Sequence, residues 1–391
     1  MDYEVLEMPE AGDRVVVGLS GGVDSTLTAL MLKERGCEVI GVTMSLWDGS
    51  LPEIKSGRPA REACFGPGEE ESIEECRKFC GALGIDYHVI GVQEAYKKNV
   101  LDYFKAEYRA GRTPNPCVRC NLHIKFGALL DGLSGLGIGY DYFCTGHYAK
   151  IVRPREGIFG TDARPCMIAT AADMAKDQTY FIHRIPSDVL EKVRFPLSSM
   201  RKSEVLARAR EAGLAAAYKE ESQDFISGEY FDILFSDRPS VPGDIIDLDG
   251  HVLGKHRGIE RYTIGQRHGL GVALSYPAYV QAIDARSNVV VLAPSGALNS
   301  GALIADDFSW PSGIEPPEEF EADVKIRLAS RPVRATVSRY TPTADDPFHY
   351  KGQAWLVTFS EPQRAVAPGQ SAVLYIDNVI VGGGVIARAL R

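Results

Sequence analysis

One short stretch, "VVVGLSGGVDS" at residues 15–25, constrains the fold more than any other part of the chain. A run of valines typical of a buried strand ends in a glycine-rich turn, and Leu27, Leu30 and Met31 then follow at helical spacing. Such a strand–turn–helix unit presents backbone N–H groups and the positive end of a helix to an anion. The turn has neither the Lys-Ser/Thr of a Walker A loop nor the three glycines of a dinucleotide-binding loop, so it indicates a phosphate site of another class.

Strand and helix patterns alternate through the first half of the chain. Strands are expected at 14–19, 38–47, 87–92 and within 141–151, and helices at 24–35, 69–83 and 94–108. This order predicts an α/β fold with a doubly wound parallel sheet that binds ligands at the C-terminal ends of its strands. Between 320 and 389, short strand runs separated by turn residues predict a small antiparallel β-barrel. A chain of 391 residues exceeds one ordinary core, so two or three domains are expected.

Net charge and hydropathy limit which partners the chain is expected to bind and where in the cell it is expected to be. The net charge of −9 argues weakly against a nucleic-acid partner, yet residues 97–125 carry seven Lys/Arg and only two acids. No apolar run approaches the roughly 20 residues that cross a bilayer. The acidic N-terminal stretch "MDYEVLEMPEAGDR" lacks the apolar core of a signal peptide. We therefore expect a cytoplasmic protein without a membrane partner.

All eight cysteines lie in the first 166 residues. A disulfide framework is not expected in a reducing compartment, so this distribution favours buried apolar positions plus one reactive or metal-binding site. Cys117 and Cys120 form a C-x-x-C pair in "PNPCVRCN", where two prolines restrict the preceding loop and Arg119 lies between the thiols. This pattern indicates an exposed, electropositive thiol site. Cys76 and Cys80, one helical turn apart, are expected on a packed face.

The phosphate-loop motif and five further motifs together resemble one known family. "SGGVDS" resembles the PP-loop of ATP pyrophosphatases, which cleave ATP between its α- and β-phosphates. "GRTPNPCVRCNLHIKFGALL" at 111–130, with "TGHYAK", "KDQTYF", "TIGQRHGLG" and "PGQSAVLY", is similar to the bacterial tRNA-specific 2-thiouridylase family. The motifs occur in the family's order over nearly the whole chain.

The resemblance implies both a domain plan and an activity. The plan is a PP-loop ATP pyrophosphatase domain of the adenine nucleotide alpha-hydrolase-like type at 1–218, a small central domain at 219–300 and a C-terminal tRNA-binding β-barrel at 301–391. The activity is ATP-dependent 2-thiolation of the wobble uridine in tRNA anticodons. AMP is attached to uracil O2, and sulfur then attacks C2. The implied partners are tRNA, Mg²⁺ and either a sulfur donor protein or a sulfide source.

The resemblance also implies roles for individual residues. ATP would contact Gly18, Leu19, Ser20, Gly21, Gly22, Val23, Asp24, Ser25, Met44 and Gly146, and Asp24 would help to hold Mg²⁺. Asn115, Pro116 and Cys117 would approach the target base. His147, Lys176, Asp177, Gln178, Arg327 and Gln370 would contact tRNA. Cys120 would be the nucleophile, because a thiolate is the reactive form of cysteine. Taken alone, Met44 is typical of a core residue and Gln370 of a turn.

The chain departs from the family pattern in two places. The usual second catalytic cysteine follows a segment like "ESQD" at 221–224, but no cysteine occurs after Cys166. Three alternatives remain: Cys117, Cys120 and a third thiolate such as Cys64 hold an iron–sulfur cluster; Cys117 or Cys64 replaces the persulfide carrier; or the chain no longer thiolates. In the barrel, Arg327-Leu328 stands where the family commonly has Arg-Tyr.

Two other functions compete with tRNA thiolation. A PP-loop ligase would adenylate its substrate and use a nucleophile without sulfur, such as ammonia. A tRNA-binding protein with an idle nucleotide pocket would release no pyrophosphate. The ligase alternative leaves "NPCVRCN" and the barrel unexplained.

Overall fold

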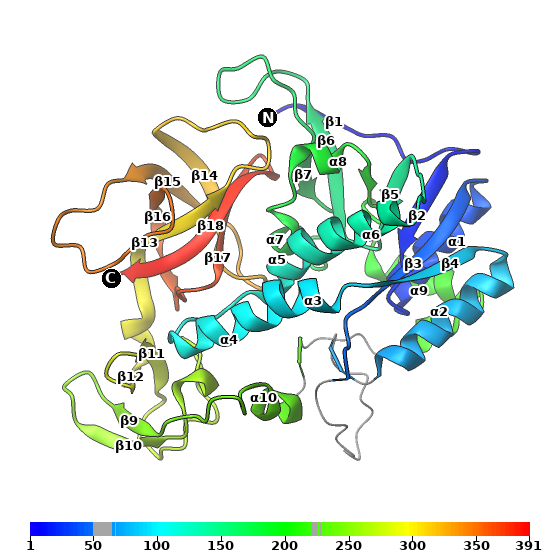
Figure 1. The fold of residues 1–391 in the computed structure, drawn as a ribbon. Coiled ribbons are helices and arrows are strands. Elements are labelled where there is room, and N and C mark those ends of the chain that lie inside the picture. Colours follow the sequence, from blue (N-terminus) through cyan, green and yellow to red (C-terminus); the bar gives the residue numbers. More distant parts are fainter. Residues whose placement is uncertain (50–64, 67, 220–224, 227) are drawn as a thin grey trace.

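The computed structural model describes residues 1–49, 65–66, 68–219, 225–226 and 228–391. In this part of the chain the strands form three sheets (Figure 1). The first is a five-stranded parallel sheet with the order β4-β3-β2-β5-β8. Its strands are β2 (Arg14–Gly18), β3 (Glu38–Ser45), β4 (Asp86–Gly91), β5 (Tyr142–Cys144) and β8 (Val193–Arg194). Strand order runs outward in both directions from β2, which confirms the doubly wound fold and places the switch point between β2 and β5.

Helices connect these strands much as the sequence pattern predicts. The larger ones are α1 (Val23–Glu34), α2 (Glu69–Leu83), α4 (Asp102–Arg109), α6 (Leu129–Gly135) and α9 (Lys202–Glu211). α3 (Gln93–Tyr96) leads through the π-helix η2 (Lys97–Leu101) into α4, and α5 (Pro116–Arg119) leads through the π-helix η3 (Cys120–Ala128) into α6. Residues 15–17 of β2 are fully buried, which explains why this strand is a continuous apolar run.

A nine-stranded antiparallel sheet contains the predicted barrel (yellow to red in Figure 1). β13 (Asn299–Ser309), β14 (Glu319–Lys325), β15 (Val333–Tyr340), β16 (Ala354–Arg364), β17 (Ser371–Ile376) and β18 (Val379–Leu390) form a ring that closes where β17 pairs with β18. The sheet continues past β18 into β7 (Met167–Thr170), β6 (Ala149–Pro154) and β1 (Tyr3–Val5). The region 141–151 therefore supplies strands to two different sheets, which its sequence pattern did not predict.

The third sheet is a small four-stranded one with the order β10-β9-β12-β11. It consists of β9 (Gly243–Ile246), β10 (Val252–His256), β11 (Tyr279–Asp284) and β12 (Val289–Ala293), and Ile245, Val280 and Val290 form its core. Short helical turns complete the fold: α7 (Thr179–Ile182), α8 (Ser187–Leu190), η4 (Ala215–Tyr218), α10 (Gly228–Leu234), η5 (Ile259–Arg261) and η6 (Ser295–Leu298). Among the described residues, a helix with the length and apolar character of a membrane span is absent.

Candidate active site

The phosphate loop, residues 18–25, lies at the switch point where β2 passes into α1. Gly21 has a φ of +74°, a conformation that favours glycine. The Ser20 N–H donates to Ser25 Oγ at 3.2 Å, and that hydroxyl donates to the Gly22 carbonyl at 3.1 Å. Gly22 occupies the N-cap of α1 and no side chain caps this helix, so its first N–H groups face a potential anion.

Gly146, just after β5, packs directly against the phosphate loop. A Cβ at this position would lie 2.8 Å from the Asp24 carbonyl carbon and 2.9 Å from the Ser25 nitrogen. These distances are shorter than ordinary van der Waals contacts, so a side chain would displace the start of α1. The two segments on either side of the switch point thus meet backbone to backbone.

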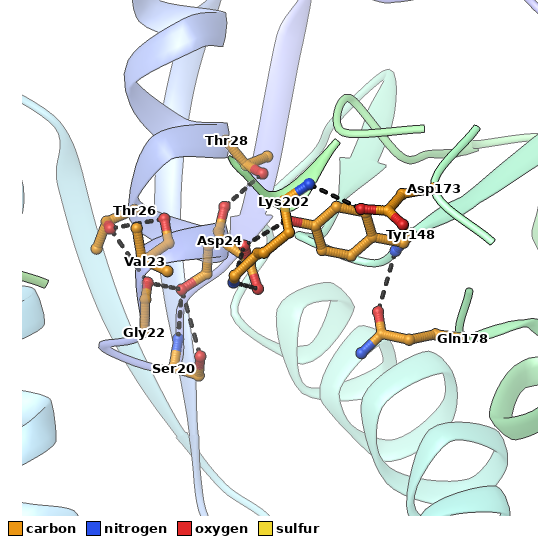
Figure 2. A network of polar contacts seen from close by, with 11 residues as sticks. Ser20, Gly22, Val23, Asp24, Thr26, Thr28, Tyr148, Asp173, Gln178 and Lys202 are labelled. Atoms are coloured by element: carbon orange, nitrogen blue, oxygen red, sulfur yellow. Dashed lines mark hydrogen bonds and ion pairs between the residues drawn. The ribbon is translucent and has the colours of Figure 1, made fainter. Parts of the chain in front are cut away.

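A buried lysine that the sequence did not single out holds the acid of the loop (Figure 2). Lys202 Nζ lies 2.7 and 2.8 Å from the two carboxylate oxygens of Asp24, and the Tyr148 hydroxyl donates to the same carboxylate at 2.8 Å. The Lys202 backbone N–H donates to Asp173 at 2.9 Å, which fixes the start of α9. Only 11% of the Lys202 side chain is exposed. Lys202 therefore lies beside the loop in the folded protein, although the loop sequence contains no lysine.

Met44 lies at the C-terminal end of β3, on the same edge of the sheet as the loop. Its side chain is half-buried and packs against the main core. The Leu19 N–H donates to the Val42 carbonyl at 2.7 Å, so the loop runs alongside this end of β3. Contact between Met44 and adenine stays a prediction that this position allows.

The cysteine segment, residues 113–123, begins with a loop and continues into α5 and the π-helix η3. Cys117 and Cys120 are both half-buried, and their spacing of three residues places them on one helical face. Cys120 is the first residue of η3, and π-helical turns occur often at functional sites. Asn115 is 6% exposed, and its Nδ2 has no hydrogen-bond partner among the described residues.

The loop Pro368–Gln370 of the barrel holds the start of the cysteine segment. Gln370 Nε2 donates to the carbonyls of Thr113 at 3.2 Å and Pro114 at 3.0 Å, and the Thr113 N–H donates to the Pro368 carbonyl at 2.7 Å. Gly369 approaches so closely that a Cβ there would lie 2.7 Å from the Thr113 oxygen. Gln370 is thus engaged with the protein itself, and its contact with tRNA stays a prediction.

The residues predicted to contact tRNA near β5 and β7 are largely covered. His147 is buried between Phe126 and Phe195 and shares a 2.7 Å hydrogen bond with Thr145; burial and nearby Lys125 hold its pKa well below the ordinary value. The Asp177 carboxylate is also buried, which raises its pKa.

Asp177 accepts hydrogen bonds from the Ala171 N–H at 2.9 Å and from Thr179. Gln178 Oε1 accepts the Tyr148 N–H at 3.0 Å (Figure 2). Lys176 is half-buried. These contacts shape the turn that carries the three residues. Their role toward tRNA stays a prediction.

Arg327 of the barrel connects the segment around Ile264 to the loop at Ala365. Its guanidinium donates to the carbonyls of Ile264 at 2.8 Å and Ala365 at 2.6 Å, while the neighbouring Leu328 is 42% exposed. Contact between Arg327 and tRNA stays a prediction. Cys64 and the segment 221–224, which the sequence interpretation singled out, lie outside the described residues.

The remaining described cysteines are buried in packed cores. Cys76 and Cys80 lie on one face of α2 with 1% and 0% exposure, which confirms the expected packed face. Burial raises the pKa of Cys80 to about 12. In the described part of the chain, the one group of three side chains with metal-ligand spacing is Asp247, Asp249 and His251, and it includes no cysteine.

A parallel sheet with an uncapped, lysine-free phosphate loop at its switch point, followed by a small domain and a closed barrel, defines a PP-loop protein of the HUP fold class. Three family models match in this order: "tRNA methyl transferase HUP domain" at residues 13–227, "tRNA methyl transferase PRC-barrel domain" at 232–294 and "Aminomethyltransferase beta-barrel domain" at 300–386. A tRNA-specific 2-thiouridylase of Endomicrobium trichonymphae is 42% identical over 95% of this chain and 98% of its own. One of Chloroflexus aurantiacus is 39% identical over 96% of this chain and 98% of its own. The chain belongs to the tRNA-specific 2-thiouridylase family.

Solved structures share a much weaker similarity. A 4-thiouridine synthetase in complex with RNA and ATP has a TM-score of 0.31 and 17% identity, over 57% of this chain and 49% of that one. The NMN synthetase of Francisella tularensis has a TM-score of 0.32 and 14% identity, over 56% of this chain and 69% of that one.

Proposed function

We propose that this protein is a tRNA-uridine 2-sulfurtransferase that uses ATP to thiolate the wobble uridine of tRNA anticodons. The observation that carries the proposal is the match of nearly the whole chain to relatives named tRNA-specific 2-thiouridylase, at about 40% identity. The geometry supports it, because a phosphate loop at the switch point and a half-buried C-x-x-C pair are the two parts that adenylation and sulfur transfer require. The boundaries 1–218, 219–300 and 301–391 and a cytoplasmic location belong to the same proposal.

The first step transfers AMP from ATP to uracil O2. The loop N–H groups at the start of α1 would hold the departing pyrophosphate, and Lys202 would add a positive charge beside it. Asp24 is the acid that would hold Mg²⁺ there, since Mg²⁺ in such sites takes one or two carboxylates and completes its shell with phosphates and water. Bound Mg²⁺ would neutralise charge on the leaving group. Asp24 would then release Lys202 toward the phosphates.

The second step replaces the activated oxygen with sulfur. The adenylated O2 leaves with AMP when a sulfur nucleophile attacks C2, and Cys120 is the cysteine that would act as nucleophile in this step. Asn115 is buried at the start of the same segment, and its amide nitrogen would donate to a carbonyl of the flipped base. Cys117 lies between these two residues in sequence.

The source of the sulfur divides the remaining alternatives. An iron–sulfur cluster takes its ligands mainly from cysteine thiolates, and among the described cysteines Cys117 and Cys120 are the two that are not fully buried. The third thiolate of the cluster alternative, Cys64, lies outside the described residues. Two sources remain consistent with the proposal: a donor persulfide that passes its outer sulfur to a thiolate of this pair and leaves as a thiolate, or sulfide that attacks C2 itself and displaces AMP.

The test separates the two steps. The protein is mixed with ATP and an anticodon-bearing tRNA transcript, and pyrophosphate release and thiolated nucleoside are measured in parallel, with sodium sulfide as the sulfur source. We expect Cys120→Ser to release pyrophosphate at the wild-type rate but to form no 2-thiouridine. Cys37→Ser is the control, because Cys37 donates to the Glu10 carbonyl far from the site and serine retains a donor there. Thiolation by Cys120→Ser at the wild-type rate would remove the nucleophile role, and absence of tRNA-dependent pyrophosphate release by the wild type would refute the proposed function.

A further inference from the structure

A charged cluster joins the cysteine segment to the barrel. Arg119 lies between Cys117 and Cys120 in sequence, and its Nη2 lies 3.2 Å from Asp307 Oδ2 on β13. Arg184, just after α7, binds the same carboxylate at both oxygens, at 3.2 and 3.1 Å. The three side chains are 21%, 28% and 10% exposed for Arg119, Asp307 and Arg184. A bidentate arginine–carboxylate contact such as that of Arg184 with Asp307 restricts the orientation of both side chains in addition to pairing their charges.

The backbone of β13 directs Asp307 toward the cysteine segment. Asp307 has a φ of +46°, a conformation that aspartate and asparagine tolerate better than most residues. It lies where the pairing of β13 with β18 shifts register between Asp306 and Ser309, and such a bulge re-aims a side chain. The Asp307 N–H donates to the Lys351 carbonyl, and the Lys351 N–H donates to Asp306, both at 2.9 Å. These two bonds hold the backbone at Asp307 in place within the barrel.

Arg119 is held on its other side by α4. Its guanidinium lies 4.7 Å from the centre of the Tyr103 ring, and the Tyr103 hydroxyl accepts the Asn115 N–H at 3.4 Å. Burial and the guanidinium groups of Arg119 and Arg184 lower the pKa of nearby His123, which favours its neutral form. The end of α5 that joins the two thiols is therefore fixed between a ring of the sheet domain and an acid of the barrel.

We propose that Asp307 is a positioning residue for sulfur transfer: the barrel holds Arg119 through it and so orients the Cys117–Cys120 turn. The inference rests on the proposed function and goes beyond it, because it gives the barrel a part in the chemistry in addition to binding RNA. The hydrogen bonds and ion pairs that join Arg119, Asp307 and Arg184 in the described part of the chain involve no residue of the phosphate loop. Loss of Asp307 should therefore slow the sulfur step and spare adenylation.

The test compares Asp307→Asn with a matched control. Asparagine has the shape of aspartate and tolerates positive φ, so this variant removes the charge without adding backbone strain. In single-turnover assays with ATP, tRNA transcript and sodium sulfide, we expect thiolation to slow about tenfold, the scale of losing a hydrogen-bonded charge, while pyrophosphate release stays within about twofold. Hydrogen exchange of peptides covering 116–123 should become faster.

The control is Asp237→Asn, because Asp237 also bridges two basic side chains, Lys105 at 3.1 Å and Arg109 at 2.7 Å, away from the cysteines. It should leave thiolation and the exchange of 116–123 unchanged. Arg184→Lys keeps the charge and loses the two-pronged contact, so it should give a smaller loss of thiolation and decides the matter if Asp307→Asn does not fold. Wild-type thiolation and exchange in Asp307→Asn, or in Arg184→Lys where the first variant fails, would overturn the inference. If the wild-type protein thiolates nothing, the proposed function fails, and hydrogen exchange then tests separately whether Asp307 orders the turn at 116–123.

Discussion

Substitution of Gly146 by alanine tests whether the two sides of the switch point form one site. The added methyl group would lie 2.8 Å from the Asp24 carbonyl carbon, 2.9 Å from Asp24 Cβ and 2.9 Å from the Ser25 nitrogen. Ordinary van der Waals contacts of a Cβ begin at 3.4 Å, so the start of α1 must move by roughly half an ångström or more. All three atoms belong to one helical turn, and no flexible side-chain end can give way in their place.

The size of the expected effect follows from that displacement. Overpacking of a well-packed site costs about 1–3 kcal/mol of stability. A shift approaching 1 Å in a group that orients a reactant can slow the reaction about 100-fold. We therefore expect Gly146→Ala to stay folded, with a lowered thermal midpoint, and to lose tRNA-dependent pyrophosphate release by about 10- to 100-fold. Steady-state pyrophosphate release at varied ATP concentration measures this loss, with thermal unfolding followed in parallel.

Gly81→Ala provides the matched control. Gly81 lies inside α2 at an ordinary helical φ, and a Cβ there would meet no atom within 4 Å. Alanine favours helix over glycine by up to about 1 kcal/mol, so this variant should be as stable as the wild type or more stable, with unchanged kinetics. Wild-type kcat and KM for ATP in Gly146→Ala would refute the conclusion that its backbone approach shapes the nucleotide site.

Two further predictions concern buried charged and titratable groups. Lys202→Met should lower the rate of pyrophosphate release by about 100-fold, because it removes a preorganised cation. Arg208→Met on the same helix removes a 2.6 Å surface ion pair with Glu34 and should change the rate little. Equal rates of pyrophosphate release in both variants would exclude a phosphate role for Lys202. His183 is fully buried, and burial lowers its pKa from 6.5 to about 3, so the unfolded chain takes up a proton below pH 6.5 that the folded protein excludes. The stability contributed by neutral His183 is complete above pH 6.5 and is lost as the pH falls toward 3. In urea unfolding at pH 4–6, the free energy of unfolding of His183→Gln should therefore fall less steeply with decreasing pH than that of the wild type, by about 1.4 kcal/mol per pH unit. An unchanged pH dependence would contradict this assignment.

Features set by local sequence were predicted well. The valine run, the glycines and the helical spacing after them place the phosphate loop between β2 and α1, because each of these signals acts over a few residues. The helix at 69–83 also begins and ends as expected, with three glutamates in its first turn and a left-handed Gly84 at its end. The C-x-x-C pair was found from its spacing and its flanking prolines.

Features that depend on distant contacts were not predicted. Lys202 meets Asp24 across 178 residues, and Asp307 meets Arg119 across 188, so no local pattern marks either residue. The union of β6 and β7 with the barrel depends on a pairing between Ala169 and Val379. Charge and hydropathy patterns report on a segment and its face, whereas these contacts depend on how separate segments are packed together.

The central claim is that ATP activates a uracil oxygen so that sulfur can replace it beside Cys120. Mass spectrometry of nucleosides from tRNA incubated with the protein, ATP and sodium sulfide tests this claim most directly. We predict a uridine heavier by the difference between sulfur and oxygen, formed at the wobble position and only when ATP is present. Thiolated uridine that forms equally well without ATP, or none at all from folded protein and intact tRNA, would contradict the claim.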